Sequence, residues 1–300
     1  MLQPFRLHEP TTVGEASGLL ARLGDEGRIY AGGTELLLAM KQGLLRYSDL
    51  VNIKRIGLDG IAFDEAAGTL RVGATTTHRS VERSPAVGAR YPMLAAMERH
   101  LANVRVRAVG TVGGNLSFAE PHSDLATVLL LYGATVRIGG ASGPRVIGVA
   151  ELLVDAYTTS LAPDELLLGI DIPALPAGAG ADYRKFAFFE RPSVGAGAAL
   201  IPGQGGALAE ARVAVGCVGP VPRRVAEAES ALAGVSLRNG AFERAASRAA
   251  EAVRHACDPV DDLYGSAEYK RHLAGVLTER ALAAARDRIL ARGRHGEGRG

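Results

Sequence analysis

The sequence predicts an α+β protein built in two parts, and three observations support this division. Up to residue 173, strand patterns and helical patterns alternate along the chain. Residues 173–181 are rich in Pro, Ala and Gly, a composition typical of a domain boundary. The patterns after this boundary indicate a strand, a hairpin and a run of helices. We therefore expect an N-terminal α+β domain at 1–175, then a small antiparallel sheet with a helical cluster at 176–291.

The first of two N-terminal subdomains is expected over residues 1–57. Apolar residues at helical spacing follow a threonine cap near its start, which predicts a helix. A short strand, a glycine turn and a second helix come next, before another strand. In order, the predicted elements are a helix at 11–23, a strand at 28–31, a helix at 36–42 and a strand at 49–54.

The second subdomain, over residues 58–175, combines a hairpin with helices and further strands. Its most unusual stretch runs from Val104 to Asp124 and contains Gly110, Gly113 and Gly114. The start of this stretch alternates between apolar and basic side chains. The other predicted elements are hairpin strands at 58–64 and 69–75, helices at 77–83, 91–101 and 125–132, and strands at 134–138, 146–149 and 165–173.

The C-terminal domain is expected to begin with β-structure and to end with helices. Alternating apolar segments around a Gly-rich turn predict a hairpin, and later segments have helical spacing. Residues 292–300 are rich in Gly and charged residues, so we expect a disordered tail there. The predicted elements are a strand at 182–190, a hairpin of 194–201 and 207–218, and helices at 225–233, 239–253 and 266–291.

Composition places the chain among soluble globular proteins, with 47% hydrophobic and 22% charged residues. The 34 basic residues nearly balance the 32 acidic ones, which argues against a nucleic-acid or membrane surface. Residues 1–10 lack the pattern of a signal peptide, and no apolar run is long enough to span a bilayer. The cysteines, Cys217 and Cys257, are too few to hold an iron–sulfur cluster. We expect a cytoplasmic protein.

Several motifs lack the context that their chemistry would require. Residues 195–200 echo the dinucleotide fingerprint, but they lie in a predicted strand with no helix after it. His122, Ser123 and Asp124 are adjacent in sequence, so they cannot form a hydrolase triad. The histidines lack metal-ligand spacing, and Cys217 lies in an apolar strand typical of a core. The sequence therefore predicts neither a catalytic side chain nor a metal site.

Two glycine-rich segments remain as candidate ligand sites, Ala31–Leu36 and Gly110–Leu116. Glycine lets the main chain adopt left-handed conformations and lets a ligand approach the backbone closely. The first segment leads into a helix, whose unpaired N–H groups and dipole suit a phosphate. Two such loops suit a dinucleotide with a diphosphate, and Asp124 could bind its ribose hydroxyl or a bridged phosphate. The alternative for each segment is a plain turn between regular elements.

Motifs spread along nearly the whole chain resemble those of a known family. They are IYAGGTEL at Ile29–Leu36, VRAVGTVGGNLSFAEPHSD at Val106–Asp124, LAPDELLLGIDIP at Leu161–Pro173, YRKF at Tyr183–Phe186 and SAEYKRHLAGVLTERAL at Ser266–Leu282. In this order they resemble the FAD-binding subunits of the molybdenum hydroxylases. That family includes the medium subunit of carbon monoxide dehydrogenase and the FAD domain of xanthine dehydrogenase. The resemblance implies a PCMH-type FAD-binding domain of two α/β subdomains, followed by the C-terminal domain described above.

The resemblance also implies which residues bind FAD. Asp124 would contact the polar middle of the cofactor, and Leu167 would lie at the isoalloxazine ring. Lys185 would approach the edge of that ring, where a cation stabilises the anionic reduced flavin. The alternative for Lys185 is an exposed strand lysine. The residues implied to wrap the diphosphate are Ile29, Tyr30, Ala31, Gly32, Gly33, Thr34, Glu35 and Leu36 in the first loop, and Thr111, Val112, Gly113, Gly114 and Asn115 in the second.

The resemblance further implies that this chain is one part of a larger enzyme. It lacks cysteine motifs for [2Fe–2S] clusters, a molybdopterin segment and the cysteine-rich insertion of the benzoyl-CoA reductase branch. We expect a [2Fe–2S] small subunit and a molybdopterin large subunit as partners, in a dimer of heterotrimers. Electrons would reach non-covalently bound FAD and pass to NAD, a quinone or oxygen. The alternatives are a free-standing FAD oxidoreductase and a non-catalytic scaffold with degenerate loops.

Overall fold

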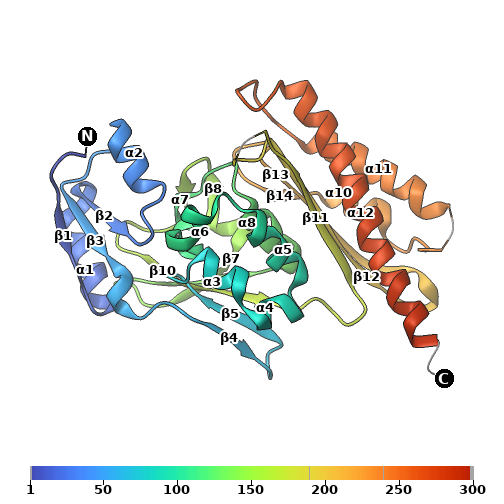
Figure 1. Cartoon of the computed structure of the whole chain (residues 1–300), viewed down its shortest axis with the longest axis horizontal. Helices are drawn as coiled ribbons and strands as arrows, with labels where there is room; N and C mark the ends of the chain where they lie inside the picture. Colours follow the sequence, from blue (N-terminus) through green and yellow to red (C-terminus); the bar gives the residue numbers. More distant parts are fainter. Residues whose placement is uncertain (1, 189, 239, 298–300) are drawn as a thin grey trace. The chain divides into compact units, whose positions relative to one another are not determined.

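The computed structural model describes residues 2–188, 190–238 and 240–297 (Figure 1). The chain forms two compact units. Unit 1 comprises Met1–Glu120 and Gly133–Pro173, and unit 2 comprises Pro121–Tyr132 and Ala174–Gly300. The segment that contains α8 (Asp124–Tyr132) belongs to unit 2, because this helix packs against strands of that unit. None of the described helices is both long and apolar enough to cross a membrane.

The first part of unit 1 is a parallel three-stranded sheet of order β1-β3-β2. Parallel neighbours need crossover connections, and the two predicted helices provide them. The first helix begins after Thr12, whose side chain accepts a hydrogen bond from the Glu15 N–H. The elements in chain order are β1 (Arg6–His8), α1 (Val13–Leu23), η1 (Gly24–Glu26), β2 (Gly27–Tyr30), α2 (Leu36–Gln42), β3 (Asp49–Asn52) and η2 (Ile53–Ile56).

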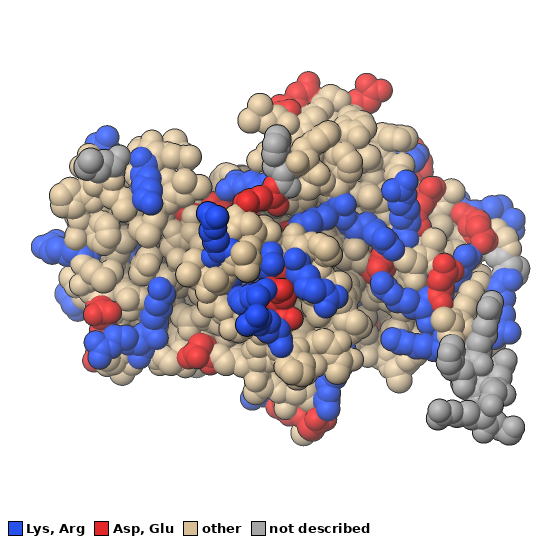
Figure 2. Space-filling model, in the orientation of Figure 1, with Lys and Arg blue, Asp and Glu red and all other residues tan. Residues whose placement is uncertain are grey.

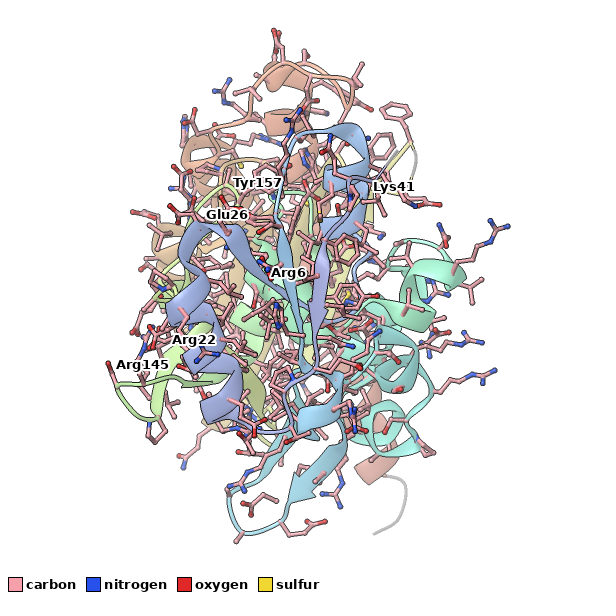
Figure 3. All side chains as sticks on the ribbon, turned by 90° about the vertical axis from the view of Figure 1, so that its left-hand side faces the viewer. Arg6, Arg22, Glu26, Lys41, Arg145 and Tyr157 are labelled. Atoms are coloured by element: carbon pink, nitrogen blue, oxygen red, sulfur yellow. The ribbon has the colours of Figure 1, made fainter. Side chains whose placement is uncertain are left out.

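The sequence patterns do not predict β1, which is joined to β3 by the buried carboxylate of Asp49. Arg6, on β1 in Figure 3, donates to this carboxylate from Nε and Nη2 at 2.8 Å each. His8 Nε2 lies 2.6 Å from the same group. The hydrogen bonds from Arg6 hold the pKa of Asp49 well below its usual range. A short strand held by a charge leaves no apolar periodicity in the sequence.

The second part of unit 1 is an antiparallel five-stranded sheet of order β4-β5-β10-β6-β7. The predicted hairpin forms its β4–β5 edge, and the predicted strand before Pro173 is central. A small two-stranded sheet and a short helix connect β7 to β10. The elements are β4 (Ile61–Asp64), β5 (Thr69–Gly73), β6 (Thr135–Gly139), β7 (Arg145–Gly148), α9 (Val149–Leu152), β8 (Leu153–Asp155), β9 (Thr158–Thr159) and β10 (Leu166–Pro173).

A helical layer lies over one face of this sheet (Figure 1). Tyr91 ties the two layers together, since its buried hydroxyl donates to the Ile172 carbonyl at 2.9 Å and accepts from the Leu70 N–H at 3.1 Å. The helices are α3 (His78–Arg83), α4 (Pro85–Arg90), α5 (Pro92–His100), α6 (Val104–Val109) and α7 (Val112–Phe118).

The alternating segment at the start of the central glycine stretch does not form a strand, because residues 104–109 form α6. The Asn103 side chain caps this helix by accepting from the N–H groups of Arg105 at 2.9 Å and Val106 at 3.1 Å. Arg107 is buried on the inner side of the helix. A good cap and a buried polar anchor therefore override the alternating pattern, which is too short to define a strand.

Unit 2 is an antiparallel sheet of order β11-β12-β13-β14 with helices, as predicted for the C-terminal domain. On β12, Ala196 and Ala198 belong to the core formed with the C-terminal helices. Gly197 lies against Leu131 of α8 instead. Strand β12 thus lies between α8 and the helical cluster. The remaining elements are β11 (Gly180–Phe186), β12 (Val194–Pro202), η3 (Gln204–Gly206), β13 (Leu208–Gly216), β14 (Arg223–Arg224), α10 (Ala226–Leu232), α11 (Ala241–Ala256) and α12 (Ala267–Glu297).

The last helix continues further than the sequence predicts. Helix α12 ends at Glu297, so residues 292–297 are helical where a disordered tail was expected. Arg292 donates to the Ala179 carbonyl at 3.0 Å, which gives the start of this segment a tertiary anchor. Residues 298–300 of the predicted tail lie outside the described residues.

Candidate cofactor site

The first glycine segment connects β2 to α2 and requires glycine at two positions. Gly33 has a φ of +72°, in the left-handed region, and a Cβ there would lie 2.5 Å from Cε2 of Tyr30. A Cβ on Gly32 would overlap the Val109 carbonyl oxygen and lie 2.8 Å from the Gly110 Cα. The two glycine segments therefore lie side by side within unit 1. A side chain on Gly32 would force them apart.

The same segment presents a row of main-chain donors. Within the described part of the chain, the N–H groups of Gly32, Gly33 and Thr34 have no hydrogen-bond acceptor. All three residues are partly buried. Consecutive main-chain N–H groups around a residue in the left-handed conformation form a concave site for an anion. This loop therefore has the chemistry to hold a phosphate.

The second glycine segment is built differently. Its N–H groups donate within the protein: Val112 to the Thr76 carbonyl at 3.0 Å, Gly113 to the Ala74 carbonyl at 2.9 Å, and Gly114 to Thr111 Oγ1 at 3.1 Å. Gly113 must be small, since a Cβ would lie 2.7 Å from the Ala74 carbonyl oxygen. Here glycine serves close packing beside the first loop. We expected both loops to offer main-chain donors to a ligand, but the N–H groups of Val112, Gly113 and Gly114 already donate to acceptors within the protein.

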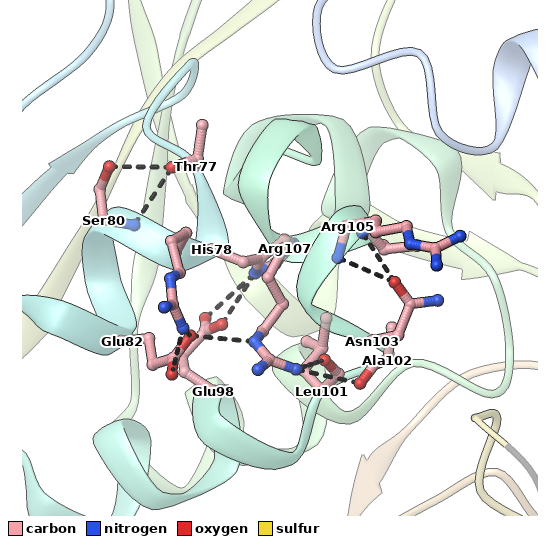
Figure 4. Close-up of polar contacts among 12 residues, drawn as sticks. Thr77, His78, Ser80, Glu82, Glu98, Leu101, Ala102, Asn103, Arg105 and Arg107 are labelled. Carbon is pink, nitrogen blue, oxygen red and sulfur yellow. Dashed lines mark hydrogen bonds and ion pairs between the residues drawn. The ribbon is translucent and has the colours of Figure 1, made fainter.

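A polar network among α3, α5 and α6 supports the second segment (Figure 4). The His78 N–H donates to the Gly110 carbonyl at 3.0 Å. The ring Nδ1 of His78 lies 3.0 Å from Oε2 of Glu98, and both side chains are buried. Because His78 is held at its ring and at its main chain, it links α5 to the glycine segment. The sequence gives no signal for this pair, since a helical His and a helical Glu are usually solvated.

Arg107 joins the same three helices. Its Nε donates to Glu82 Oε2 at 2.9 Å, and its Nη1 donates to the carbonyl of Leu101 at 2.8 Å. These contacts link α6 to α3 and to the end of α5 (Figure 4). Helix α6 leads directly into Gly110, whose N–H donates to the Val106 carbonyl at 2.7 Å. The contacts of Arg107 therefore hold α6 in place, and α6 in turn positions the start of the second glycine segment.

In unit 2, the candidate residues Asp124 and Lys185 form a pair. The Asp124 side chain at the start of α8 is 3% exposed, and its Oδ2 lies 2.7 Å from Lys185 Nζ on β11. Its Oδ1 accepts a hydrogen bond from the Tyr183 hydroxyl at 2.6 Å. The Lys185 side chain is 18% exposed, so the alternative of an exposed strand lysine is wrong. Tyr183 and Lys185 share one side of β11, because residues two apart on a strand point the same way.

Comparison with known proteins identifies the family. A family model described as "FAD binding domain in molybdopterin dehydrogenase" matches residues 3–175. A second, described as "CO dehydrogenase flavoprotein C-terminal domain", matches residues 192–285. The chain belongs to the FAD-binding subunits of the molybdenum hydroxylases. The predicted family and fold class are thus confirmed. FAD is the cofactor of this oxidoreductase family, and the open donors of the first loop fit its diphosphate.

Individual members of this family match over almost their whole length. The carbon monoxide dehydrogenase medium chain of Hydrogenophaga pseudoflava is 34% identical over 95% of this chain and 98% of that protein. The nicotine 6-hydroxylase medium subunit of Paenarthrobacter nicotinovorans is 32% identical, with 95% and 98% covered. A solved structure of the H. pseudoflava carbon monoxide dehydrogenase matches with a TM-score of 0.91 at 33% identity, covering 96% of this chain and 99% of that one.

Leu167 lies in the FAD-binding domain model's range, on the central strand β10. It is buried at 4% exposure and pairs with Ile138 just before an irregularity in the β10–β6 register. The next residue, Leu168, accepts a hydrogen bond from the Ala74 N–H at 3.1 Å. Strand β10 therefore contacts the segment that also packs against Gly113. Contact between Leu167 and the flavin ring stays a prediction.

The glycines of residues 195–200 have a structural role in this flavoprotein subunit. Gly195 and Gly197 lie on β12, opposite Lys185 and Tyr183 of β11. A Cβ on Gly195 would overlap the Tyr183 hydroxyl, and one on Gly197 would lie 3.2 Å from Tyr183 Cδ2. The glycines make room for the tyrosine that donates to Asp124. The motif is therefore no dinucleotide fingerprint, in agreement with the sequence analysis.

We expect Tyr183 to make the flavoprotein less stable at alkaline pH. Burial, and next the Asp124 carboxylate, raise the pKa of Tyr183 well above its ordinary value of 10.0. The folded protein therefore keeps this proton where the unfolded chain loses it, so the contribution to stability is present below pH 10.0 and is lost as pH rises above it. Denaturation between neutral and alkaline pH, compared with Tyr183→Phe, measures the effect. An unchanged pH dependence in the variant would contradict it.

Proposed function

We propose that this chain is the FAD-carrying electron-transfer subunit of a multi-subunit molybdenum hydroxylase. It would receive electrons from [2Fe–2S] clusters of a small partner subunit, while a large partner subunit would hold the molybdopterin. The main support is the row of open N–H groups at Gly32, Gly33 and Thr34 in a chain of this family. The relatives named as medium chains or medium subunits support the placement within a larger enzyme.

We further propose distinct roles for the candidate residues. The N–H groups of Gly32, Gly33 and Thr34 would hold the diphosphate, with the rest of Ile29–Leu36 around it. Residues 111–115 would shape the other wall. Asp124 would contact the polar middle of FAD, Leu167 the ring, and Lys185 the ring edge. Because Asp124 pairs with Lys185, the ammonium group would be oriented before the cofactor arrives.

Bound FAD would supply redox chemistry between the clusters and an acceptor such as NAD, a quinone or oxygen. The chain itself would bind and orient the cofactor, and Lys185 would add positive charge at the edge of the ring. No side-chain acid or base is required. We propose FAD-binding and C-terminal domains at 1–175 and 176–291, non-covalent FAD, a dimer of heterotrimers and a cytoplasmic location. Both cysteines are buried thiols, which suits a reducing compartment.

The test is to purify the chain with its partners and to analyse the cofactors. We expect a yellow protein, release of about one FAD per chain on acid precipitation, and co-purifying subunits with [2Fe–2S] and molybdopterin absorbance. If the isolated chain turns over a small-molecule substrate without partners, it is a free-standing FAD oxidoreductase. If the complex forms but the chain holds no FAD, it is a non-catalytic scaffold.

A further inference from the structure

The loop that joins α11 to α12 exposes apolar side chains to an unusual degree. Leu263 is 93% exposed and Val260 is 70% exposed. Tyr269, in the first turn of α12, is also exposed and packs beside Gly265 of this loop. Its ring lies 6.2 Å from that of Phe186, which contacts exposed Phe188 at 5.0 Å. We call Val260, Leu263, Tyr269 and Phe188 the apolar patch of unit 2.

The loop is held rigidly from the inside. The Lys270 side chain, 1% exposed, places its Nζ 2.5 Å from Asp262 Oδ1 and donates to the Val260 carbonyl at 3.0 Å. Asp262 Oδ1 also accepts from the Tyr264 N–H at 2.7 Å. Asp262 and Gly265 exchange two main-chain hydrogen bonds of 3.2 Å each. Breaking this contact would leave a buried charge without compensation, so the ion pair holds the loop in one conformation.

A second link joins the loop to the turn before α8. The ring of His122 lies 4.7 Å from that of Tyr264, and its Nε2 is 3.8 Å from Asp262 Oδ2. The loop is thus supported by two other segments of unit 2. Because the Leu263 side chain is 93% exposed, it contributes little to the packing of unit 2. Such preorganised apolar anchors are typical of binding surfaces, because little conformational freedom is lost on contact.

The exposed charged residues in the loop and at the start of α12 are mostly acidic. Asp258, Asp261, Asp262 and Glu268 outnumber Arg271. Acidic side chains stand at the top of Figure 2, where this loop and the start of α12 lie. The α3–α6 region has the opposite character, with exposed arginines at Arg83 and Arg99. An acidic rim around apolar anchors favours a partner with an apolar recess and a basic rim.

We propose that the apolar patch of unit 2 is a docking surface for another subunit of the same enzyme, one that offers an apolar recess rimmed by Lys or Arg. This inference rests on the proposed function, in which the chain works inside a complex. A second copy of this chain fits less well, because two acidic rims would repel each other. The relatives' names, medium chain and medium subunit, agree with a permanent subunit contact.

The experiment uses the complete enzyme, assembled by co-expression with the subunits that co-purify with the wild-type chain. Leu263→Asp places a charge at the centre of the contact, and we expect association to weaken by about tenfold or more. Glu268→Lys should weaken it less and reduce its dependence on salt. Val146→Asp, on β7 at 59% exposure, is the matched control and should assemble normally. FAD content and circular dichroism report whether each variant is folded.

The outcomes separate this inference from the proposed function. If the wild-type chain binds no other subunit, the proposed function fails. If the wild-type complex forms and Leu263→Asp assembles equally well, the docking surface is wrong. If the patch variant instead abolishes self-association of this chain, the patch binds a second copy, which also overturns the proposal.

Discussion

A Gly32→Val variant is expected to lose FAD binding by about two orders of magnitude or more, equivalent to about 3 kcal/mol. The reason is geometric. Any Cβ at this position overlaps the Val109 carbonyl oxygen and crowds the Gly110 Cα at 2.8 Å, so the two glycine segments must separate. Separation would displace the N–H groups that we propose to hold the diphosphate. FAD content after purification and flavin titration of the apoprotein measure the effect.

Controls make this result specific. Gly88→Val introduces the same side chain on α4, where no atom lies within 4 Å of the added Cβ. It should retain FAD. Gly33→Val should also lose FAD, because Gly33 has a left-handed φ of +72°. Gly114→Val should have a smaller effect, since its Cβ meets only the Thr111 hydroxyl at 2.7 Å. Normal FAD content in both Gly32→Val and Gly33→Val would refute the assignment of the first loop.

An Asp124→Asn variant is expected to destabilise unit 2 by about 3 kcal/mol, because it removes the carboxylate charge that lies 2.7 Å from the largely buried Lys185 ammonium. The Tyr183 hydroxyl would keep an acceptor in the amide oxygen, so the loss of charge is the main change. Chemical denaturation measures the free energy of unfolding. Loss of FAD from the same variant, beyond what instability causes, would support the proposed contact with the cofactor.

A double-mutant cycle isolates this pair. Lys185→Met removes the ammonium, so the double variant should be more stable than the sum of the single effects predicts. Glu251→Gln is the matched control in unit 2, because Glu251 forms an ion pair with Arg254 at the surface. The Glu251 side chain is 52% exposed and the Arg254 side chain 33%. Such pairs contribute about 0–1 kcal/mol. Additive effects for Asp124 and Lys185 would show that their charges are not coupled.

Local patterns were sufficient for much of the fold. The Thr12 cap and helical spacing predict α1, and the turn at residues 65–68 predicts the β4–β5 hairpin. Each depends on interactions between residues close in sequence. The alternating segment at residues 104–109 does not form a strand, because Asn103 and the buried Arg107 favour α6. The sequence patterns do not predict β1, because the contact that holds it joins Arg6 to Asp49, 43 residues later in the sequence.

The family, the cofactor and the importance of the two glycine segments follow from the sequence, because motif order and glycine spacing are properties of the chain. The difference between those segments depends on how the chain folds. In the described structure, the first leaves the N–H groups of Gly32, Gly33 and Thr34 open, while the second uses those of Val112 and Gly113 to pack against residues 74–76. Likewise, the structure alone joined Asp124 to Lys185 and buried the pair. Such choices depend on distances between residues far apart in sequence, which no local pattern records.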